Sequence, residues 1–501
     1  MSLGKSVARI GKLSSVYLIG SIIPMIVGFA LMPVFTRYLY TEQMGIVNLS
    51  ARIMGPVSIL IQLGVLYSLK SHFFRMEASA RPQVIKTVLV GQIVQAGLIC
   101  VVLSVAGIWI SGAMMPNLPL SPKMVLGLWL IVIWGCFFFS LMRVGTMLMQ
   151  LLERAVACVS LKLLKYGLQV GLGLVAVVWL GWGGLGRQQA IFAATVVAGA
   201  VAVVLVKRCS GGGRFDLATY KRMLATGISF IPHTLAASLS LSINAWLLNK
   251  LVTASALGVY GIALAFAQLM EFPLASFNNA AYPTLAGLMS DGGREARRHQ
   301  SRLYTLLISG FAVLTLGVAM FAPILIKILA HARYHEAALV VPVLTVAYLF
   351  QGFYVVAGVP VFYVGGGLWL AAATLSGLLV NVVLAFLLIP RYGMYGAALA
   401  IVGCFATRFA VIAVVGQRKY PLPWQVGAIF RALAAAGVLA AVDFFVAPRL
   451  AFLPAFGLKV LLLLAVAPLM WALGVVNTRE VAWLGRLVAE KARSLLKRPR
   501  S

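Results

Sequence analysis

The chain alternates between long apolar stretches and short polar segments, many of which are basic. A helix that spans a bilayer needs about 20 consecutive apolar residues, and stretches of that length recur along the sequence. We predict an all-α polytopic membrane protein with about fourteen transmembrane helices. The predicted spans lie at residues 14–38, 44–69, 87–112, 124–151, 157–180, 188–206, 223–249, 255–286, 304–328, 338–363, 368–389, 393–416, 424–446 and 456–476.

Composition supports a membrane protein. Hydrophobic residues make up 62% of the 501 residues and charged residues 10%, and the mean hydropathy is +1.00. In soluble domains, roughly a quarter of all residues are charged. The sequence therefore contains no segment that we interpret as a separate soluble domain.

The basic residues predict the orientation in the membrane. The net charge is +30, and Lys and Arg concentrate in the short segments between apolar stretches. With the first residue on the cytoplasmic side, the predicted inner segments hold 29 Lys and Arg and the outer segments hold 9. Such a bias in short loops places the basic side in the cytoplasm. We therefore predict two cytoplasmic termini and no nucleic-acid partner.

The last segment has a character of its own. Residues 478–501 space Val481, Leu484, Val488 and Leu495 at helical intervals, with basic residues between them. This pattern predicts an amphipathic helix on the inner leaflet, where anionic lipids are its partners. A disordered basic tail is the alternative.

Two short patterns recur in the two halves of the chain. RYLYTEQMGIVNLS at 37–50 aligns with KLVTASALGVYGIA at 250–263, which brings Gly45 onto Gly258. GWGGLGRQQAI at 181–191 aligns with RYGMYGAALAI at 391–401, which brings Gly183 onto Gly393. The offsets are nearly equal, so we predict a duplicated six-helix unit with a pseudo-two-fold axis along the membrane normal. The predicted divisions are 1–210 and 211–420 as two six-helix lobes, 421–477 as two extra helices, and 478–501 as the tail.

Several stretches resemble a known family. They are GFALMPVFTRYLYTEQMGIVNL near the start, ALGVYGIALAF, NNAAYPTLAGLMSDGGREARRH and NVVLAFLLIPRYGMYGAALAI. All are similar to the Wzx-type polysaccharide and O-antigen flippases of the multidrug/oligosaccharidyl-lipid/polysaccharide (MOP) exporter superfamily. Two adjacent positions depart from the family: many members have an Asp followed by a basic residue where this chain has Asn244 and Ala245.

The resemblance implies two six-helix lobes around a central cavity with alternating access. It implies that a polyprenyl-diphosphate oligosaccharide, such as an O-antigen or exopolysaccharide repeat unit, moves from the cytoplasmic to the outer leaflet. A glycan polymerase and glycosyltransferases of the same pathway are then the expected partners.

Charged residues inside spans are costly, so we treat them as candidates for function. Arg52, Arg143 and Arg408 fall inside predicted spans. The chain has 41 Lys and Arg against 11 Asp and Glu, so few acids are available to pair with them. A diphosphate is an anion that Arg binds through paired hydrogen bonds. We predict that these three arginines line one cationic cavity and bind it.

Four further residues extend this predicted substrate site. Lys162 and Lys165 enter the fifth span from its inner end, and Gln351 and Asn381 are polar residues deep in their spans. The alternative for the two lysines is that their side chains snorkel to the interface without binding a ligand.

Glu271 and His233 are the deep residues able to change protonation, and we predict that they couple transport to an ion gradient. The alternatives are a structural ion pair between Glu271 and Arg408, and a packing role for His233 beside Pro232.

No enzyme or cofactor is expected. The sequence has no nucleotide-binding Gly-rich loop and no His, Cys, Asp and Glu at metal-binding spacing, and its five cysteines are scattered. The alternatives that stay open are a flippase for a lipid II-type cell-wall precursor, a drug/cation antiporter of the same superfamily, and a membrane glycan polymerase or ligase.

Overall fold

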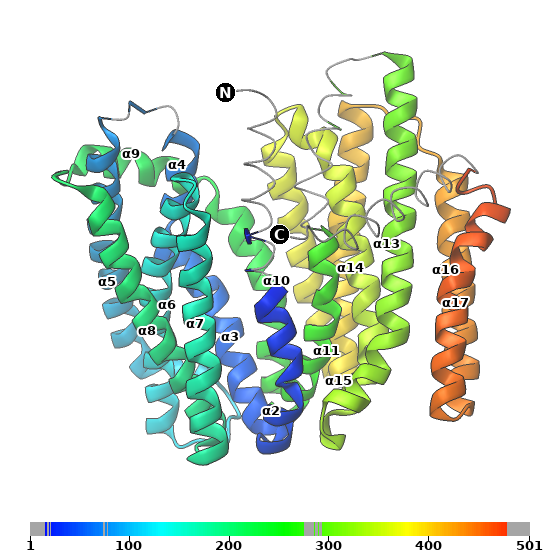
Figure 1. Cartoon of the computed structure of the whole chain (residues 1–501), viewed down its shortest axis with the longest axis horizontal. Helices are drawn as coiled ribbons and strands as arrows, with labels where there is room; N and C mark the ends of the chain where they lie inside the picture. Colours follow the sequence, from blue (N-terminus) through cyan, green and yellow to red (C-terminus); the bar gives the residue numbers. More distant parts are fainter. Residues whose placement is uncertain are drawn as a thin grey trace, which may run out of the picture. The chain divides into compact units, whose positions relative to one another are not determined.

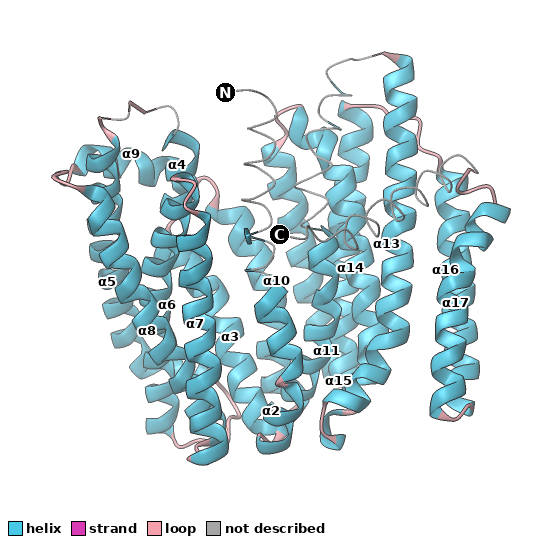
Figure 2. Ribbon diagram, in the orientation of Figure 1, coloured by secondary structure: helices cyan, strands magenta, loops and turns pink. Residues whose placement is uncertain are grey.

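The structure is a computed structural model that describes residues 16–17, 20, 22–73, 76–77, 79–274, 285, 289 and 293–477. Helix dominates this part of the chain, and no strand occurs in it (Figure 2). The chain divides into two compact units, which are described separately. The first unit comprises Met1–Ala263, Leu325–Val340 and Thr374–Cys404, and the second comprises Leu264–Ile324, Val341–Ala373 and Phe405–Ser501.

The first unit contains the N-terminal helices (Figure 1). Helical residues 22–30 precede α2. The elements that follow are α2 (Met32–Tyr38), α3 (Thr41–Gln62), α4 (Val65–His72), α5 (Arg81–Met114), α6 (Pro122–Leu151), α7 (Ala155–Leu174) with the π-helix η2 (Val175–Trp179), α8 (Gly183–Ser210), α9 (Leu217–Ile228), α10 (Ile231–Leu251) and α11 (Ala254–Ala267).

The remaining elements belong mainly to the second unit. They are η3 (Gln268–Met270), α13 (Arg294–Leu329), η4 (Ala332–Tyr334), α14 (Ala337–Tyr363), α15 (Gly367–Lys419), α16 (Val426–Val446), η5 (Ala447–Arg449) and α17 (Phe452–Ala472). The unit boundaries run through α11, α13, α14 and α15, so η4 and the middle of α15, residues 374–404, belong to the first unit, and the last residues of α11 belong to the second.

The helices fall where the apolar stretches predict them. The predicted span at 44–69 is interrupted at Leu63 and Gly64, between α3 and α4. The predicted span at 223–249 is the pair α9–α10, which is bent by 54°. Pro232 lies in the first turn of α10, where its missing N–H is tolerated. The 53 residues of α15 contain the two predicted spans 368–389 and 393–416, and Gly393 breaks the helix between them with φ 53°.

Eleven helices of the described part are long and apolar enough to cross a membrane, or twelve if α9–α10 counts as one span. The predicted count of fourteen is not established by this number. The first predicted span lies partly outside the described residues, and α15 enters the count once although it holds two predicted spans. The predicted tail helix at 478–501 lies outside the described residues.

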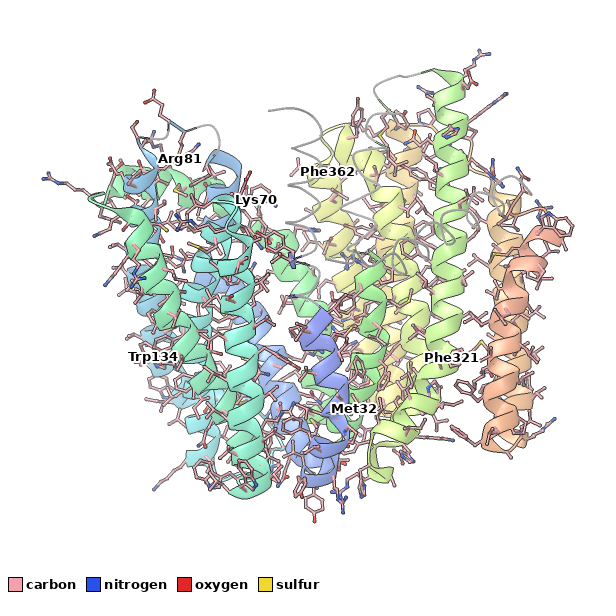
Figure 3. The ribbon with its side chains drawn as sticks, viewed as in Figure 1. Met32, Lys70, Arg81, Trp134, Phe321 and Phe362 are labelled. Atoms are coloured by element: carbon pink, nitrogen blue, oxygen red, sulfur yellow. The ribbon has the colours of Figure 1, made fainter. Side chains whose placement is uncertain are left out.

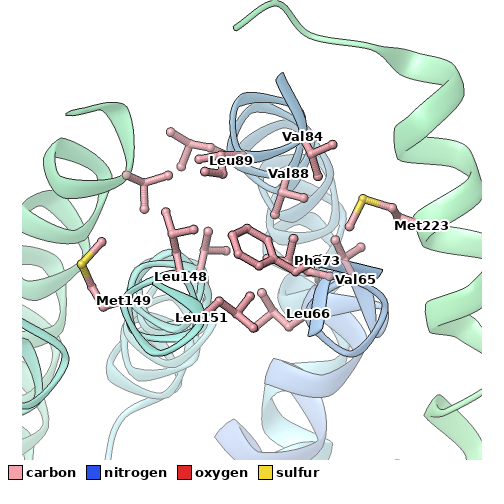
Figure 4. Close-up of a cluster of buried hydrophobic side chains, with 14 of the residues drawn as sticks. Val65, Leu66, Phe73, Val84, Val88, Leu89, Leu148, Met149, Leu151 and Met223 are labelled. Carbon is pink, nitrogen blue, oxygen red and sulfur yellow. The ribbon is translucent and has the colours of Figure 1, made fainter. Parts of the chain in front are cut away.

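The first unit is held together at one end by an apolar cluster (Figure 4). Phe73, Leu89 and Leu148 are almost completely buried there, and side chains from α4, α5, α6 and α9 surround them. The guanidinium of Arg81 lies 5.0 Å from the centroid of the Phe73 ring. Lys70 and Arg81 are at this same end (Figure 3), the end that the charge distribution assigns to the cytoplasm.

The glycines of the predicted repeat match in pairs, Gly45 with Gly258 in their contacts and Gly183 with Gly393 in their backbone conformation. A Cβ on Gly45 would collide with the carbonyl of Ala254, and a Cβ on Gly258 would collide with the carbonyl of Thr41. Under the offset of the first sequence match, Thr41 corresponds to Ala254, so the two contacts are reciprocal. Gly183 and Gly393 both have positive φ, at 59° and 53°. The lobe boundaries at 210 and 420 and the superposition of the two lobes stay predictions.

Candidate functional site

One face of α6 presents a cation and two polar side chains. Arg143, Thr146 and Gln150 follow each other at three- and four-residue intervals, which puts them on the same side of a helix. Phe139 lies one turn before Arg143 on this face. The fold positions the face next to α7, because α6 and α7 join at the short turn after Leu151 and pack along each other (Figure 1).

Helix α7 contributes two lysines by the same periodicity. Lys162, Lys165 and Tyr166 are three and four residues apart and face α6. The Nζ of Lys165 lies 5.4 Å from the centroid of the Phe139 ring, within range of a cation–π interaction.

The first helical segment closes the site through small residues. A Cβ on Gly20 would come within 2.6 Å of the Val159 side chain, and one on Gly28 within 3.1 Å of the Tyr166 hydroxyl. Only glycine allows such an approach at Gly20 without a shift of α7. Gly20 and Pro24, one turn apart, therefore form a wall of the site.

These three elements enclose a cavity of about 490 Å³. Its lining consists of Gly20, Pro24, Phe139, Met142, Arg143, Thr146, Met147, Gln150, Lys162, Lys165 and Tyr166. Among the described residues of this lining, three are cations and none is an acid. Within the described residues, none of the three cations forms an ion pair with an acid. Their positive charges therefore act together on whatever occupies the cavity.

Arg52 is outside this lining. It lies on α3, where its backbone carbonyl accepts a hydrogen bond of 2.7 Å from the Ser242 hydroxyl of α10. Its guanidinium interacts electrostatically with the Tyr260 hydroxyl of α11. Arg52 therefore lies between α3, α10 and α11, and its sharing of one cavity with Arg143 stays a prediction.

Arg408 belongs to the second unit, where it is 6% exposed. Its guanidinium stacks between Tyr354 at 4.6 Å and Phe405 at 5.3 Å from the ring centroids. Its Nε atom is buried and has no hydrogen-bond partner among the described residues. Arg408 and Glu271, which are both described, form neither a hydrogen bond nor an ion pair with each other, so the alternative of a structural bridge finds no support.

The two predicted coupling residues lie in different units. Glu271 is exposed, and its carboxylate accepts hydrogen bonds from the Tyr348 hydroxyl at 3.3 Å and the Gln268 amide at 3.4 Å. His233 shares a hydrogen bond of 2.9 Å between its Nδ1 and the Thr374 hydroxyl.

The predicted polar residues differ in how they are engaged. Asn381 is completely buried, and its amide donates to the Ser240 carbonyl at 2.9 Å and to Asn244 Oδ1 at 3.1 Å. Asn244 in turn donates to the Ala397 carbonyl, so this pair joins α10 to α15. Gln351 lies on α14 with a buried Oε1 that has no partner among the described residues.

Sequence reasoning identified three of the cavity residues and missed the others. Thr146, Gln150 and Tyr166 were detectable from their helical spacing to Arg143 and Lys162. Gly20 and Pro24 carry no such signal, because their contribution depends on how closely the first segment approaches α7. Across the described residues, no group of three His, Cys, Asp or Glu side chains is placed to hold a metal ion.

Comparison with known families then identifies the chain. The family described as "Polysaccharide biosynthesis protein" matches residues 10–289, more than half of the sequence. The chain belongs to this family. No curated protein matches it.

Solved structures show the same fold. A lipid II flippase MurJ in an inward closed conformation has a TM-score of 0.72 at 10% identity, covering 91% of this chain and 98% of its own. A multidrug resistance MATE family transporter of the MOP superfamily, inward-facing, has a TM-score of 0.61 at 16% identity over 80% and 97%. A MOP superfamily transporter from Pyrococcus furiosus, described as having a binding pocket of reverse polarity, has a TM-score of 0.53 at 16% identity over 82% and 95%. The polysaccharide biosynthesis chain thus has the MOP transporter fold.

Proposed function

We propose that this protein is a flippase that moves a polyprenyl-diphosphate-linked oligosaccharide from the cytoplasmic to the outer leaflet of a bacterial inner membrane. The observation that carries the proposal is the cavity between the first segment, α6 and α7. Arg143, Lys162 and Lys165 converge there without an acid. Membership of the polysaccharide biosynthesis family and the MOP fold support a lipid-linked glycan as the cargo.

The chemistry of the three cations suits a diphosphate. Arg143 can hold two oxygens through parallel N–H bonds, while Lys162 and Lys165 add compact charges that need no fixed plane. A cavity of about 490 Å³ is within the usual range for small-ligand sites, roughly 300–1,000 Å³. The diphosphate and first sugars would occupy it, while the polyprenyl tail would stay in lipid.

The alternatives differ in how well they fit this electrostatics. A drug/cation antiporter is disfavoured, because three unpaired cations repel a cationic substrate. A lipid II-type precursor also carries a polyprenyl diphosphate, and the similarity to MurJ makes it the second candidate. A polymerase or ligase is an enzyme, and no catalytic constellation in the sequence supports it.

The proposal extends to the other predicted residues. Arg52, Arg408, Gln351 and Asn381 would contact the cargo in other stages of the transport cycle. Both termini would be cytoplasmic. Glycosyltransferases would supply the cargo, and a glycan polymerase would consume it.

Replacement of the cavity cations tests the proposal. Each lost charged hydrogen bond is worth about 1.5–3 kcal/mol, and about 1.4 kcal/mol is a factor of ten. We therefore expect Arg143→Ala, Lys162→Ala and Lys165→Ala each to weaken glycan export by roughly tenfold to a hundredfold. Arg143→Lys should rescue only part of it, because Lys lacks the paired geometry. Export by complementation, divided by the amount of protein in the membrane, is the measurement.

Lys207→Ala provides the matched control. Lys207 is an exposed cation in the last turn of α8 of the same unit, outside the cavity lining. The Lys207→Ala variant should export glycan at the level of the unaltered protein. Export at the control level by all three cavity variants would refute the diphosphate site.

A further inference from the structure

A second group of cations lies toward the other end of the first unit, around the C-terminal half of α2. Arg187 is in the second turn of α8, and its guanidinium lies 3.7 Å from the centroid of the Phe35 ring. One of its Nη atoms is buried without a hydrogen-bond partner in the described part of the chain. The side chain as a whole retains some exposure.

Arg333 reaches the same region from the short segment around η4. The His331 N–H donates a hydrogen bond of 3.0 Å to the Thr36 hydroxyl, and the Tyr334 hydroxyl donates one of 2.9 Å to the Leu39 carbonyl. These bonds fix η4 against α2. The Arg333 guanidinium then stacks on Tyr40, 4.5 Å from its centroid.

The two arginines share a deficit of acceptors. An Nη atom of Arg333 is also buried without a partner within the described residues. Both guanidinium groups interact electrostatically with the buried Tyr334 hydroxyl. Glu42 closely follows α2 and Glu336 closely follows η4, and both are exposed and form no ion pair with either arginine.

Stacking determines which part of each guanidinium can bind. The ring of Phe35 covers a flat face of Arg187, and the ring of Tyr40 covers one of Arg333. The Nε–H of Arg333 is donated to His331 Nδ1 at 3.1 Å, so the Nη N–H groups of that side chain remain. N–H donors in the plane of a guanidinium match the oxygens of a phosphate. Buried donors without acceptors are costly, so an anion would stabilise this arrangement.

We propose that Arg187 and Arg333 form a second anion site, which binds a phosphate or diphosphate group. Tyr166 lines the cavity and also lies near Arg187, so this tyrosine is shared by the surroundings of both sites. The inference rests on the proposed flippase function: the cargo's diphosphate would pass from the cavity cations to Arg187 and Arg333. A phosphate from a membrane lipid is the other source of the same chemistry.

Binding of inorganic pyrophosphate to the purified full chain tests the site. In nanodiscs of phosphatidylcholine, calorimetry should find two binding sites per chain. Arg187→Gln and Arg333→Gln should each remove the second site and leave the cavity site. A variant that combines Arg143→Gln with Lys165→Gln should remove the cavity site and leave the second. Arg37→Gln, which alters an exposed arginine of α2, should retain both.

Nanodiscs of phosphatidylglycerol distinguish the two sources. If a lipid phosphate occupies the site, pyrophosphate binding at that site should be lost in phosphatidylglycerol nanodiscs. Native mass spectrometry should then find phosphatidylglycerol retained on the protein, and replacement of Arg187 or Arg333 should abolish this retention. If both Gln variants match Arg37→Gln in pyrophosphate sites and in retained lipid, the second site does not exist. If Arg187→Gln does not fold, Arg333→Gln alone decides. If the variant with Arg143→Gln and Lys165→Gln retains both pyrophosphate sites while Arg187→Gln and Arg333→Gln each lose one, the cavity proposal fails and the second site stands.

Discussion

At the residue scale, arginines that look alike in the sequence have different surroundings. Arg143 lines a cavity with two lysines. Arg408 is stacked between two aromatic rings, and Arg187, which lies between two predicted spans, covers Phe35. The cost of a charge within a span marks Arg143 and Arg408 as unusual. Tyr354 and the two lysines come from other helices than the arginines that they accompany, so only the structure distinguishes these surroundings.

Glu271 and His233 lead to a prediction about energy coupling. If protonation of these groups accompanies transport, Glu271→Gln and His233→Ala should each slow gradient-driven export by at least about tenfold, or about 1.4 kcal/mol. Export into inverted vesicles with an imposed proton gradient measures this. Thr374→Val is the control for His233, because it removes their shared hydrogen bond and keeps the imidazole. Unchanged export by both variants, with the gradient intact, would exclude coupling through these residues.

At the scale of elements, glycines fix where helices meet and end. Gly45 and Gly258 let α3 and α11 approach until each backbone touches the other. Gly183 begins α8 and Gly393 breaks α15, both with positive φ that other residues adopt only at a cost. The sequence matches that suggested a duplication therefore fall on positions with a physical need for glycine. That need explains why they are recognisable at all.

The last two spanning helices are joined by a buried ion pair. The Nζ of Lys459 lies 2.6 Å from both carboxylate oxygens of Asp443, which links α17 to α16. Removing one partner leaves an uncompensated buried charge, which costs about 3–5 kcal/mol. We expect Lys459→Met and Asp443→Leu each to lower stability by about that amount in thermal unfolding of the purified protein.

The double variant should recover most of this loss, because no charge is then left alone. Arg449→Met, an exposed cation just after α16, should change stability little. A double variant as unstable as the sum of the two single variants would show that the ion pair contributes no coupling.

At the scale of the whole molecule, the balance of charges predicts the orientation. A reporter fused after Arg222 in α9 should be cytoplasmic, and one fused after Thr253, between α10 and α11, should be on the outer face. A fluorescent protein that is bright only in the cytoplasm and a phosphatase that is active only outside report the two locations. The opposite pattern at both positions would reverse the orientation, and the same side at both would remove the α10 span.

The sequence by itself determined the class of the protein and the position of its helices. A bilayer imposes a minimum apolar length on each span, and an apolar stretch of that length can be recognised in the sequence alone. Residue spacing also placed Arg143 on one helix face and the two lysines on another. Only the tertiary structure decided that these faces meet in one cavity, that Arg408 stacks between two aromatic rings, and that Lys459 pairs with Asp443. Such contacts depend on the close approach of segments far apart in the chain, which small residues such as Gly20 permit and which a linear pattern does not record.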